Sequence, residues 1–443
     1  MQTLRDYRYL VKNRKHLTSE KITSLQLKEL QRLLHYAKEN SPYYKNNEAY
    51  QVVDSWDAFH HLPFINKAIM MEHFSDINTC GLDKDETMTY ALEKEKNKDY
   101  LGYYKDEYVI GLSSGTSGNK GLYITPKSMT KRLPGVFLAR GGVMLRDLPA
   151  RILFCLRVFS QGFQDINAPL LKLTYASTMT PTEDLIQTMN DKKINILMAP
   201  PSMMRVLMPF ASRIKYPLKK IITYAEVLSS ADRLQFSTIF KAPVIEIYQA
   251  SEGQIASPCK AGKLHINEDL VYVELYDENN HLIKEPHIIG HKMVLTNLIN
   301  YAQPLIRYEM NDMIVLDEPC SCGSSFRTIE KIIGRRDDNL WFYDQNKKPK
   351  IVYADLFARW IITESDMIRE FQVIQDDISS IHLCLDLLGD YDVSLLKQRL
   401  LHELHALGVE GIITLETVKL DLPRDANKFK RFISHVSIDT SST

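Results

Sequence analysis

The sequence has no excess of charge of either sign. Lys plus Arg and Asp plus Glu each count 55 among 443 residues, so the formal net charge is zero. A chain without a global field has no long-range attraction for nucleic acid or for an anionic membrane surface. We therefore expect a small-molecule ligand, and neither a nucleic-acid nor a membrane partner.

Long apolar runs and abundant cysteines are also missing. No run approaches the length needed to span a membrane, and the basic N-terminal segment lacks the apolar core of a signal peptide. Six cysteines are too few for a disulfide framework in so long a chain, so any cluster among them favours metal binding. These absences predict a cytoplasmic globular protein, and they leave its oligomeric state open.

The chain does have length and apolar content. Its 443 residues, 44% of them hydrophobic, exceed the size at which one core keeps growing, so at least two domains are expected. Between residues 151 and 270 short apolar runs alternate with helical patterns, which indicates an α/β fold with layers around a largely parallel sheet. Two later strand patterns predict a β-rich subdomain, and a small mobile α+β domain is expected after it. The predicted organisation is an N-terminal core of 1–334, a hinge of 335–338 and a C-terminal domain of 339–443.

A glycine-rich stretch at 110–126 is the most informative segment. Its glycines allow close approach of the backbone to a ligand, and its hydroxyls, N–H groups and one lysine suit a polyphosphate. The flanks 108–112 and 122–125 read as two strands of a hairpin, unlike the strand and helix of a Walker loop. A flexible polar hairpin turn is the plainer alternative. The candidate phosphate-binding residues are Ser113, Ser114, Gly115, Thr116, Ser117, Gly118 and Lys120.

Three further stretches follow the glycine loop along the chain. They are 248–252 (YQASE), 306–312 (IRYEMND) with 334–338 (GRRDD), and 422–431 (LPRDANKFKR). In this order and spacing the four stretches resemble the adenylate-forming superfamily of acyl-CoA synthetases, peptide-synthetase adenylation domains and luciferases. Within it the chain resembles most the phenylacetate-CoA ligase and coenzyme F390 synthetase branch.

This resemblance implies an enzyme that uses ATP and Mg²⁺ to activate a carboxylic acid as an acyl adenylate, with release of pyrophosphate. The glycine loop and Lys120 would restrain the phosphates, Glu252 would hold Mg²⁺ by hard oxygen ligation, and Lys428 would stabilise the transition state. The implied catalytic residues are Lys428, Glu252, Thr116 and Lys120. The implied nucleotide-binding residues beyond the loop are Ala225, Glu226, Tyr248, Gln249, Ser251, Asp312 and Arg335.

The acid and its acceptor follow less directly from the sequence. An acyl pocket is expected at Phe159, Tyr224, Ala199 and Pro200, whose apolar and aromatic character favours an aryl or apolar acid. The acceptor is expected to be a thiol, on CoA or on the phosphopantetheine of a carrier protein. The glycine-rich loop that shapes the thiol channel in CoA ligases is missing after Asp338. The alternatives are a ligase with an amide or other non-thioester product, and a nucleotide-binding homologue without catalysis.

Four residues outside these stretches predict a metal site. Cys259, His265, Cys320 and Cys322 offer three thiolates and one imidazole, a donor set of closed tetrahedral Zn²⁺ sites. The spacing is not that of a zinc finger, but members of the resembled branch show a similar arrangement. The role of this zinc would be structural, since four protein ligands leave no open position. The alternative is that these four side chains are independent and form no metal site.

Overall fold

The computed structural model describes residues 2–97, 99, 101–113, 120–156, 161–164, 166, 170–177, 180–365, 367–420 and 430–436. Contacts divide the chain into two compact units. The first comprises Met1–Leu228, Gln235–Met310 and Ile314–Lys331, and the second Ser229–Leu234, Asn311–Met313 and Ile332–Thr443. The predicted hinge and domain boundary stay predictions. Among the described residues, no helix is both long and apolar enough to cross a membrane.

A five-stranded parallel sheet forms the centre of the first unit, with the order β4-β3-β5-β6-β7. Successive residues of its strands are buried on opposite faces, which explains why these strands read as continuous apolar runs. The predicted parallel α/β layer is therefore confirmed. The strands are β3 (Ala150–Leu156), β4 (Leu171–Ser177), β5 (Ile196–Met198), β6 (Lys220–Thr223) and β7 (Val244–Glu246).

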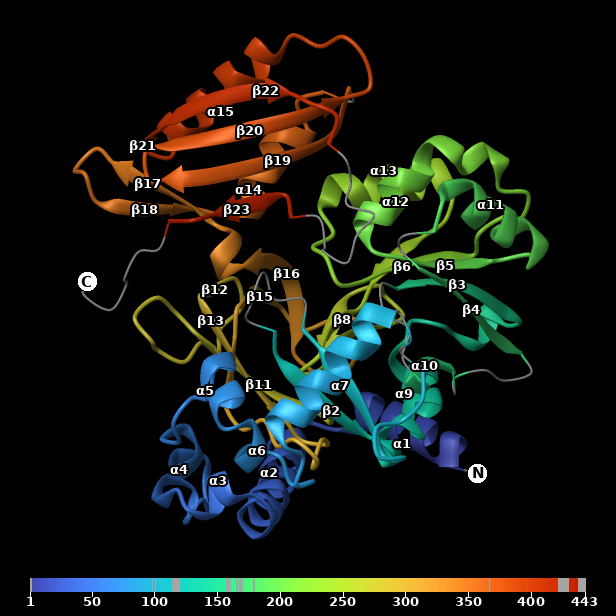
Figure 1. Ribbon diagram of the computed structural model, residues 1–443, viewed down its shortest axis with the longest axis vertical. Coiled ribbons are helices and arrows are strands. Elements are labelled where there is room, and N and C mark those ends of the chain that lie inside the picture. Colours follow the sequence, from blue (N-terminus) through green and yellow to red (C-terminus); the bar gives the residue numbers. More distant parts are fainter. Residues whose placement is uncertain are drawn as a thin grey trace. The chain divides into compact units, whose positions relative to one another are not determined.

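Helices cover both faces of this sheet (Figure 1). On one face, apolar side chains of three helices pack against Leu153 and Leu197; on the other, α9 and α10 pack against Phe154 and Met198. The first three are α11 (Thr182–Asp191), α12 (Pro201–Leu207) and α13 (Ser230–Phe240). The other two are α9 (Leu133–Arg140) and α10 (Gln161–Gln164).

Three further sheets of the first unit are antiparallel. A hairpin joins β1 (Tyr108–Leu112) to β2 (Leu122–Pro126), and a three-stranded sheet has the order β11-β13-β14. A six-stranded sheet has the order β12-β15-β16-β10-β9-β8, and its strand β16 continues into the second unit. These sheets match the predicted β-rich subdomain. The strands are β8 (Tyr248–Ala250), β9 (Gly253–Pro258), β10 (Leu264–Ile266), β11 (Val271–Tyr276), β12 (Ile289–Gly290), β13 (Lys292–Asn297), β14 (Tyr308–Met310), β15 (Asp312–Asp317) and β16 (Thr328–Arg335).

The N-terminal part of the first unit is helical. Helix α2 is amphipathic, with Leu30, Leu33, Leu34 and Ala37 buried at helical spacing, as its sequence pattern predicts. The longer helices are α1 (Gln2–His16), α2 (Ser19–Asn40) and α7 (Lys84–Asn97). The short ones are α3 (Pro42–Lys45), α4 (Trp56–His60), α5 (Lys67–Glu72), α6 (Phe74–Ile77) and α8 (Lys127–Thr130).

The second unit is an α+β structure with its own core. Two helices pack their apolar faces on a four-stranded sheet of order β22-β20-β19-β23, and a small sheet has the order β18-β17-β21. The helices are α14 (Ala354–Ile362) and α15 (Val393–Ala406). The strands are β17 (Leu340–Asp344), β18 (Pro349–Val352), β19 (Ile368–Asp377), β20 (Ser380–Leu387), β21 (Val409–Glu410), β22 (Ile412–Thr417) and β23 (Phe432–Ser434).

Candidate active site

The glycine-rich stretch is the loop of the β1–β2 hairpin. The strands pair from Tyr108↔Pro126 to Leu112↔Leu122, so the two predicted strands are confirmed. At the base of the loop the Ser113 N–H donates to the Gly121 carbonyl (2.9 Å), and the Gly121 N–H donates to Ser113 Oγ (2.8 Å). These bonds close the neck of the hairpin. The predicted phosphate-binding residues Ser114, Gly115, Thr116, Ser117 and Gly118 lie outside the described residues.

Strand β2 is anchored by two buried amides from the segment after β13. Gln303 accepts from the Ile124 N–H through Oε1 (2.9 Å) and donates through Nε2 to the Leu122 carbonyl (3.0 Å). Asn300 Nδ2 donates to the Ile124 carbonyl (2.9 Å). Both amides are almost inaccessible to solvent. The backbone groups on this side of β2 are therefore satisfied without a further strand, and the hairpin has a fixed base.

Tyr123 joins three of the four stretches noted in the sequence. Its hydroxyl, on β2, donates to Glu252 Oε1 at 2.6 Å and lies 3.3 Å from the hydroxyl of Tyr308 on β14. Burial, and then the Glu252 carboxylate, raise the pKa of both tyrosines far above the ordinary value, so both hydroxyls keep their protons. The glycine hairpin, the Glu252 turn and the 306–312 segment thus converge on one carboxylate.

Glu252 lies in the turn between β8 and β9. Asn297 Nδ2 donates to its backbone carbonyl at 2.7 Å, which fixes the turn to the end of β13. One hydrogen bond thus fixes the backbone of Glu252 and another fixes one oxygen of its carboxylate. A carboxylate fixed in this way can ligate a hard cation. No helix begins at Glu252.

Lys120 forms an ion pair that the sequence did not indicate. Its Nζ donates to Glu95 Oε2 on α7 in a short hydrogen bond, and both side chains are partly shielded from solvent. The sequence assigned Lys120 to phosphate. In this structure Glu95 balances its charge, and a phosphate at the loop would compete with Glu95 for the ammonium group.

The other predicted nucleotide-binding residues beyond the loop lie after β6 or along β8 and the turn that follows it. Tyr248 is buried on β8 with Gln249 beside it and Ser251 in the following turn. Ala225 follows β6 with φ 64°, a left-handed conformation that residues with a side chain rarely adopt. The Glu226 carboxylate accepts from the Ser202 N–H (2.8 Å) and from Ser202 Oγ (2.7 Å), so its two oxygens bind the start of α12.

Two of the predicted nucleotide-binding residues, Asp312 and Arg335, belong to the second unit. Arg335 Nε lies 3.8 Å from Asp312 Oδ1, and the Arg336 N–H donates to the Asn311 carbonyl at 2.8 Å. Asp312 begins β15 while Arg335 ends β16, so the sheet brings together residues 23 positions apart in the sequence (335 − 312). Lys428 lies outside the described residues.

A small cavity of about 50 Å³ lies beside Tyr248 in the first unit. Its walls are mainly apolar and come from α9, β3, α10 and β5, with Tyr248 and Gln249 on one side. Tyr224 packs edge-on against Phe154 of the wall (ring centroids 5.4 Å apart), and Ala199 and Pro200 follow the lining residue Met198. Three of the predicted pocket residues therefore back or adjoin this cavity without lining it; Phe159 lies outside the described residues.

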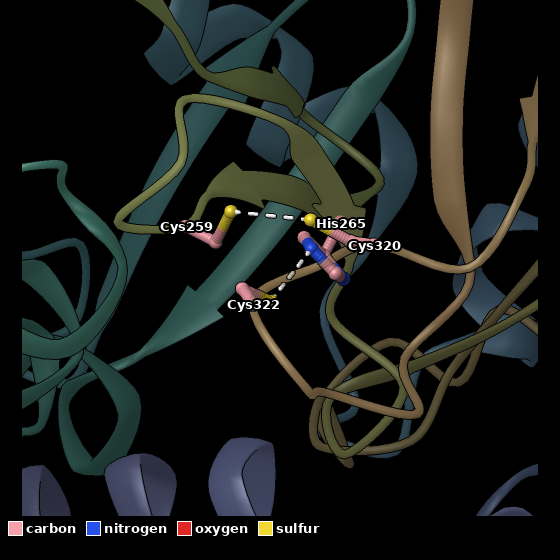
Figure 2. A group of neighbouring side chains, drawn as sticks. All are labelled: Cys259, His265, Cys320 and Cys322. Carbon is pink, nitrogen blue, oxygen red and sulfur yellow. Dashed lines mark hydrogen bonds between the residues drawn. The ribbon is translucent and has the colours of Figure 1, made fainter.

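The four predicted metal ligands come together at the other end of β9. The sulfur atoms and a ring nitrogen of Cys259, His265, Cys320 and Cys322 all lie within 4.8 Å of one another (Figure 2). Cys259 Sγ is 3.8 Å from Cys320 Sγ, and Cys322 Sγ is 3.5 Å from His265 Nε2.

The orientation of His265 suits a ligand. Its Nδ1 is hydrogen-bonded to the Phe326 carbonyl at 2.8 Å, which places the proton on Nδ1 and turns Nε2 toward the cysteines. Burial, and then the charge of Arg14, lower the pKa of His265 to about 4, so the imidazole is neutral. Three thiol groups and an imidazole oriented by the Phe326 carbonyl fit Zn²⁺.

Three residues of this region were not singled out by the sequence analysis. Tyr123 and Glu95 contact predicted site residues, and Arg140 lines the cavity. Tyr123 stands within the hairpin strand that was predicted, and its alternation with Leu122 and Ile124 places its side chain on a defined face. Its partner Glu252 is 129 positions away, so no local pattern joins the two.

Comparison with known proteins supports a relationship over most of the chain. No protein-family model matches it. The phenylacetate-coenzyme A ligase of Thermus thermophilus is 26% identical over 366 residues, covering 77% of this chain and 76% of that protein. The phenylacetate-coenzyme A ligase of Aromatoleum evansii is 32% identical over 170 residues, covering 36% and 38%.

Solved structures with the same fold extend this likeness. A 2-hydroxyisobutyryl-CoA ligase in the postadenylation state with R3-HIB-AMP has a TM-score of 0.72 at 16% identity, covering 96% of this chain and 91% of that one. The same ligase with 2-HIB-AMP and CoA in the thioesterification state has a TM-score of 0.59 at 17% identity, covering 95% and 91%. The chain therefore has the fold of these adenylate-bound ligases, and over most of its length it is similar in sequence to a phenylacetate-coenzyme A ligase.

Proposed function

We propose that the protein is an ATP- and Mg²⁺-dependent ligase that joins a carboxylic acid to a thiol through an acyl adenylate. The observation that carries this proposal is the convergence of the glycine hairpin, Glu252 and Tyr308 on the Tyr123 hydroxyl. A site that binds a polyanion beside a cation needs flexible N–H donors and a fixed carboxylate next to each other. The similarity to phenylacetate-CoA ligases supports the same reaction class.

In the first half-reaction a carboxylate oxygen of the acid attacks the α-phosphorus of ATP. The bond from this phosphorus to the bridging oxygen breaks, and pyrophosphate leaves with the electron pair. We assign the phosphate contacts to Ser113 and the loop residues 114–118 with Lys120, and the Mg²⁺ contact to Glu252. Lys428 would neutralise charge that develops between the acid and the α-phosphate. Mg²⁺ supplies charge neutralisation on the phosphates when bound.

In the second half-reaction the sulfur of a thiol attacks the acyl carbon and AMP leaves. The thiol proton passes to solvent, so an acid, ATP and a thiol yield a thioester, AMP and pyrophosphate. We propose CoA as the thiol, because the relatives that cover most of the chain are named as CoA ligases. A carrier-protein phosphopantetheine offers the same thiol, and an amine acceptor would give an amide.

For the nucleoside we propose that Tyr248 stacks on the adenine, while Asp312 and Arg335 bind the ribose hydroxyls. Gln249, Ser251 and Ala225 would complete the base site from neighbouring strand ends. Ala225 follows β6 of the parallel sheet, and the carboxyl ends of parallel strands are the usual ligand position in open α/β sheets. Glu226 would act from a distance by fixing α12 through Ser202.

We propose an aryl or other apolar acid as substrate. The cavity beside Tyr248 is walled by Phe137, Phe154, Phe163 and Met198, which suits an apolar body. We also propose that Cys259, His265, Cys320 and Cys322 bind a structural zinc ion, because four soft donors converge with no open ligand position.

Pyrophosphate exchange tests the reaction class. The protein is incubated with ATP, Mg²⁺ and labelled pyrophosphate, and with single members of a panel of aryl, aliphatic and amino acids. We expect label to enter ATP only with particular acids, most strongly with aryl or apolar ones. CoA, free phosphopantetheine and an amine are then added to identify the acceptor by mass. Exchange with no acid of the panel would contradict an acid-activating enzyme and favour a nucleotide-binding homologue.

A further inference from the structure

Arg140 is one of the residues that line the cavity beside Tyr248. This arginine is the last residue of α9, and only 4% of its surface is accessible. Its Nη2 donates to both oxygens of Asp269 (3.1 and 3.0 Å) and to the Leu10 carbonyl (3.0 Å). Its Nε and Nη1 are buried and find no acceptor among the described residues. Buried donors without a partner are rare and costly, so these two need an acceptor.

Two other polar residues that line the cavity are bonded to each other. Ser257 Oγ donates to Asn267 Oδ1 at 2.6 Å and accepts from Arg14 Nη1 at 3.2 Å. Asn267 Nδ2 donates to the Gln254 carbonyl at 2.9 Å. Among the described residues that line the cavity, Arg140 is the one whose buried side-chain donors find no acceptor.

The unmet need at Arg140 is for a hydrogen-bond acceptor, not for a charge. The Asp269 side chain is fully buried, and both its oxygens face Nη2, so Arg140 already has a carboxylate partner. A second carboxylate beside Arg140 would have to be buried as an ion, whereas a neutral oxygen would accept hydrogen bonds without that cost. The volume of about 50 Å³ exceeds the roughly 30 Å³ of one water molecule and fits the end of a small organic molecule.

We propose that the acid bound by this protein carries a neutral oxygen acceptor, a hydroxyl, ether or carbonyl group, at the end remote from its carboxylate, and that Arg140 Nε and Nη1 bind it. The inference rests on the proposed acid activation and narrows its substrate class. The apolar walls contact the part of the acid that enters the cavity, and Arg140 binds its far end. Arg140 is then a specificity-determining residue that takes no part in the chemistry.

Matched acids test this proposal with the unmodified protein. Rates of acid-dependent pyrophosphate release are measured for aryl and alkyl acids in sets of four, whose far end carries hydrogen, methyl, hydroxyl or carboxylate. We expect the hydroxyl member of at least one set to exceed the methyl member of similar size by about 10-fold or more in kcat/KM. The carboxylate member should be the poorest of its set.

A double variant tests whether Arg140 causes the preference for the hydroxyl acid over the methyl acid. Arg140→Gln combined with Asp269→Asn removes both charges together and leaves no lone buried ion. The hydroxyl-to-methyl ratio should fall to about 1 in this variant, and the ratio is the readout because it does not depend on the amount of folded protein. The matched control is Arg132→Gln with Asp6→Asn, an ion pair of the same helix region at 3.4 Å that does not line the cavity. The control should keep the ratio of the unmodified protein.

The outcomes separate this inference from the function on which it rests. Absence of pyrophosphate release with every acid would contradict the acid-activating function itself. Activation with equal rates for hydroxyl and methyl members would show that water alone satisfies Arg140, and would overturn the inference. A preference for the carboxylate member, or a hydroxyl preference that persists in the Arg140→Gln variant, would overturn it as well.

Discussion

The two ends of strand β9 carry two clusters of different kinds. Glu252 immediately precedes the strand and accepts a hydrogen bond from Tyr123, whereas Cys259 immediately follows it and lies among soft donors. Tyr123 and Glu252 are held by a direct bond of 2.6 Å, but the sulfurs and imidazole nitrogen approach one another only to 3.5 and 3.8 Å. Thiols are weak hydrogen-bonding groups. A short hydrogen bond thus holds the side chains of the first cluster together. Only weak interactions connect the side chains of the second cluster.

This difference separates a chemical role from a structural one. A carboxylate beside a loop that we propose to bind phosphate can neutralise charge that changes during a reaction. A closed set of four ligands has no position for a substrate, and its metal instead contributes to folding. Substitutions in the Glu252 cluster should therefore lower the reaction rate and leave the stability unchanged. Substitutions in the cysteine and histidine cluster should lower the stability of the fold first.

The largest effect is expected from Lys428→Ala. Loss of a charge that acts only in the transition state should lower acid-dependent pyrophosphate exchange by about 100- to 1,000-fold, with the melting temperature unchanged. Thioester formation from a preformed acyl adenylate should continue. Lys419→Ala, an exposed lysine upstream of the same motif, is the control and should exchange normally. Near-normal exchange by the Lys428 variant would show that this lysine takes no part in adenylation.

Glu252→Gln keeps the shape of the side chain and removes its charge. We expect about a 100-fold loss of exchange at low Mg²⁺, because an amide is a poor replacement for a carboxylate in a site that neutralises phosphate charge. Raising the Mg²⁺ concentration should recover part of the rate, which distinguishes a weakened metal site from a distorted one. If the loss is the same at every Mg²⁺ concentration, the assignment of Glu252 to the metal is wrong.

Cys322→Ser tests the other end of β9. Purified protein should contain one zinc ion per chain by elemental analysis, and the variant should contain much less. Loss of an ion that binds only the folded state should cost about 2 to 3 kcal/mol of unfolding free energy and lower the melting temperature on the order of 5 °C. ATP binding should weaken indirectly, since β9 joins this cluster to Glu252.

The control for the zinc prediction is Cys80→Ser. Cys80 is partly buried like Cys322 but lies outside the cluster, so this variant should retain the zinc and almost all of the stability. A metal-free purified protein whose melting temperature does not respond to chelators would show that the four side chains merely pack together.

The contrast between the clusters also explains what the sequence could predict. Cys259, His265, Cys320 and Cys322 were predicted as a set because they offer three thiolates and one imidazole and because members of the resembled branch show a similar arrangement. The hairpin strands were predicted because two strand patterns flank a glycine-rich stretch. Neither prediction required knowledge of a long-range contact.

Tyr123 and Arg140 were missed because neither carries such a signal. Tyrosine in a strand and arginine at the end of a helix are ordinary residues, and their importance comes from partners 129 positions away in both cases, Glu252 and Asp269. The strand order of the six-stranded sheet could not be predicted either, because it depends on pairings such as β10 with β16 that no local pattern encodes. Long-range contacts therefore account for most of what the sequence left open.

The smallest effect is expected from Tyr123→Phe, which removes only the hydroxyl that orients Glu252. Partners of a metal-ligating side chain typically contribute 10- to 100-fold to metal affinity, and we expect about 10-fold weaker Mg²⁺·ATP binding. The effect should be the same between about pH 6 and pH 9, because the raised pKa of Tyr123 keeps its proton throughout this range. Tyr103→Phe, which removes a hydroxyl bonded to Thr130 at 2.8 Å, is the matched control and should bind normally.

A double-mutant cycle shows whether Tyr123 acts through Glu252. If its hydroxyl only orients the carboxylate, Tyr123→Phe should have little further effect on Mg²⁺·ATP binding in the Glu252→Gln background, and the two changes should be far from additive. Equal effects of Tyr123→Phe in both backgrounds would mean that the hydroxyl contacts the nucleotide independently. The hydrogen bond of 2.6 Å between them would then be a packing contact, and the convergence of the three segments would no longer support the proposed function.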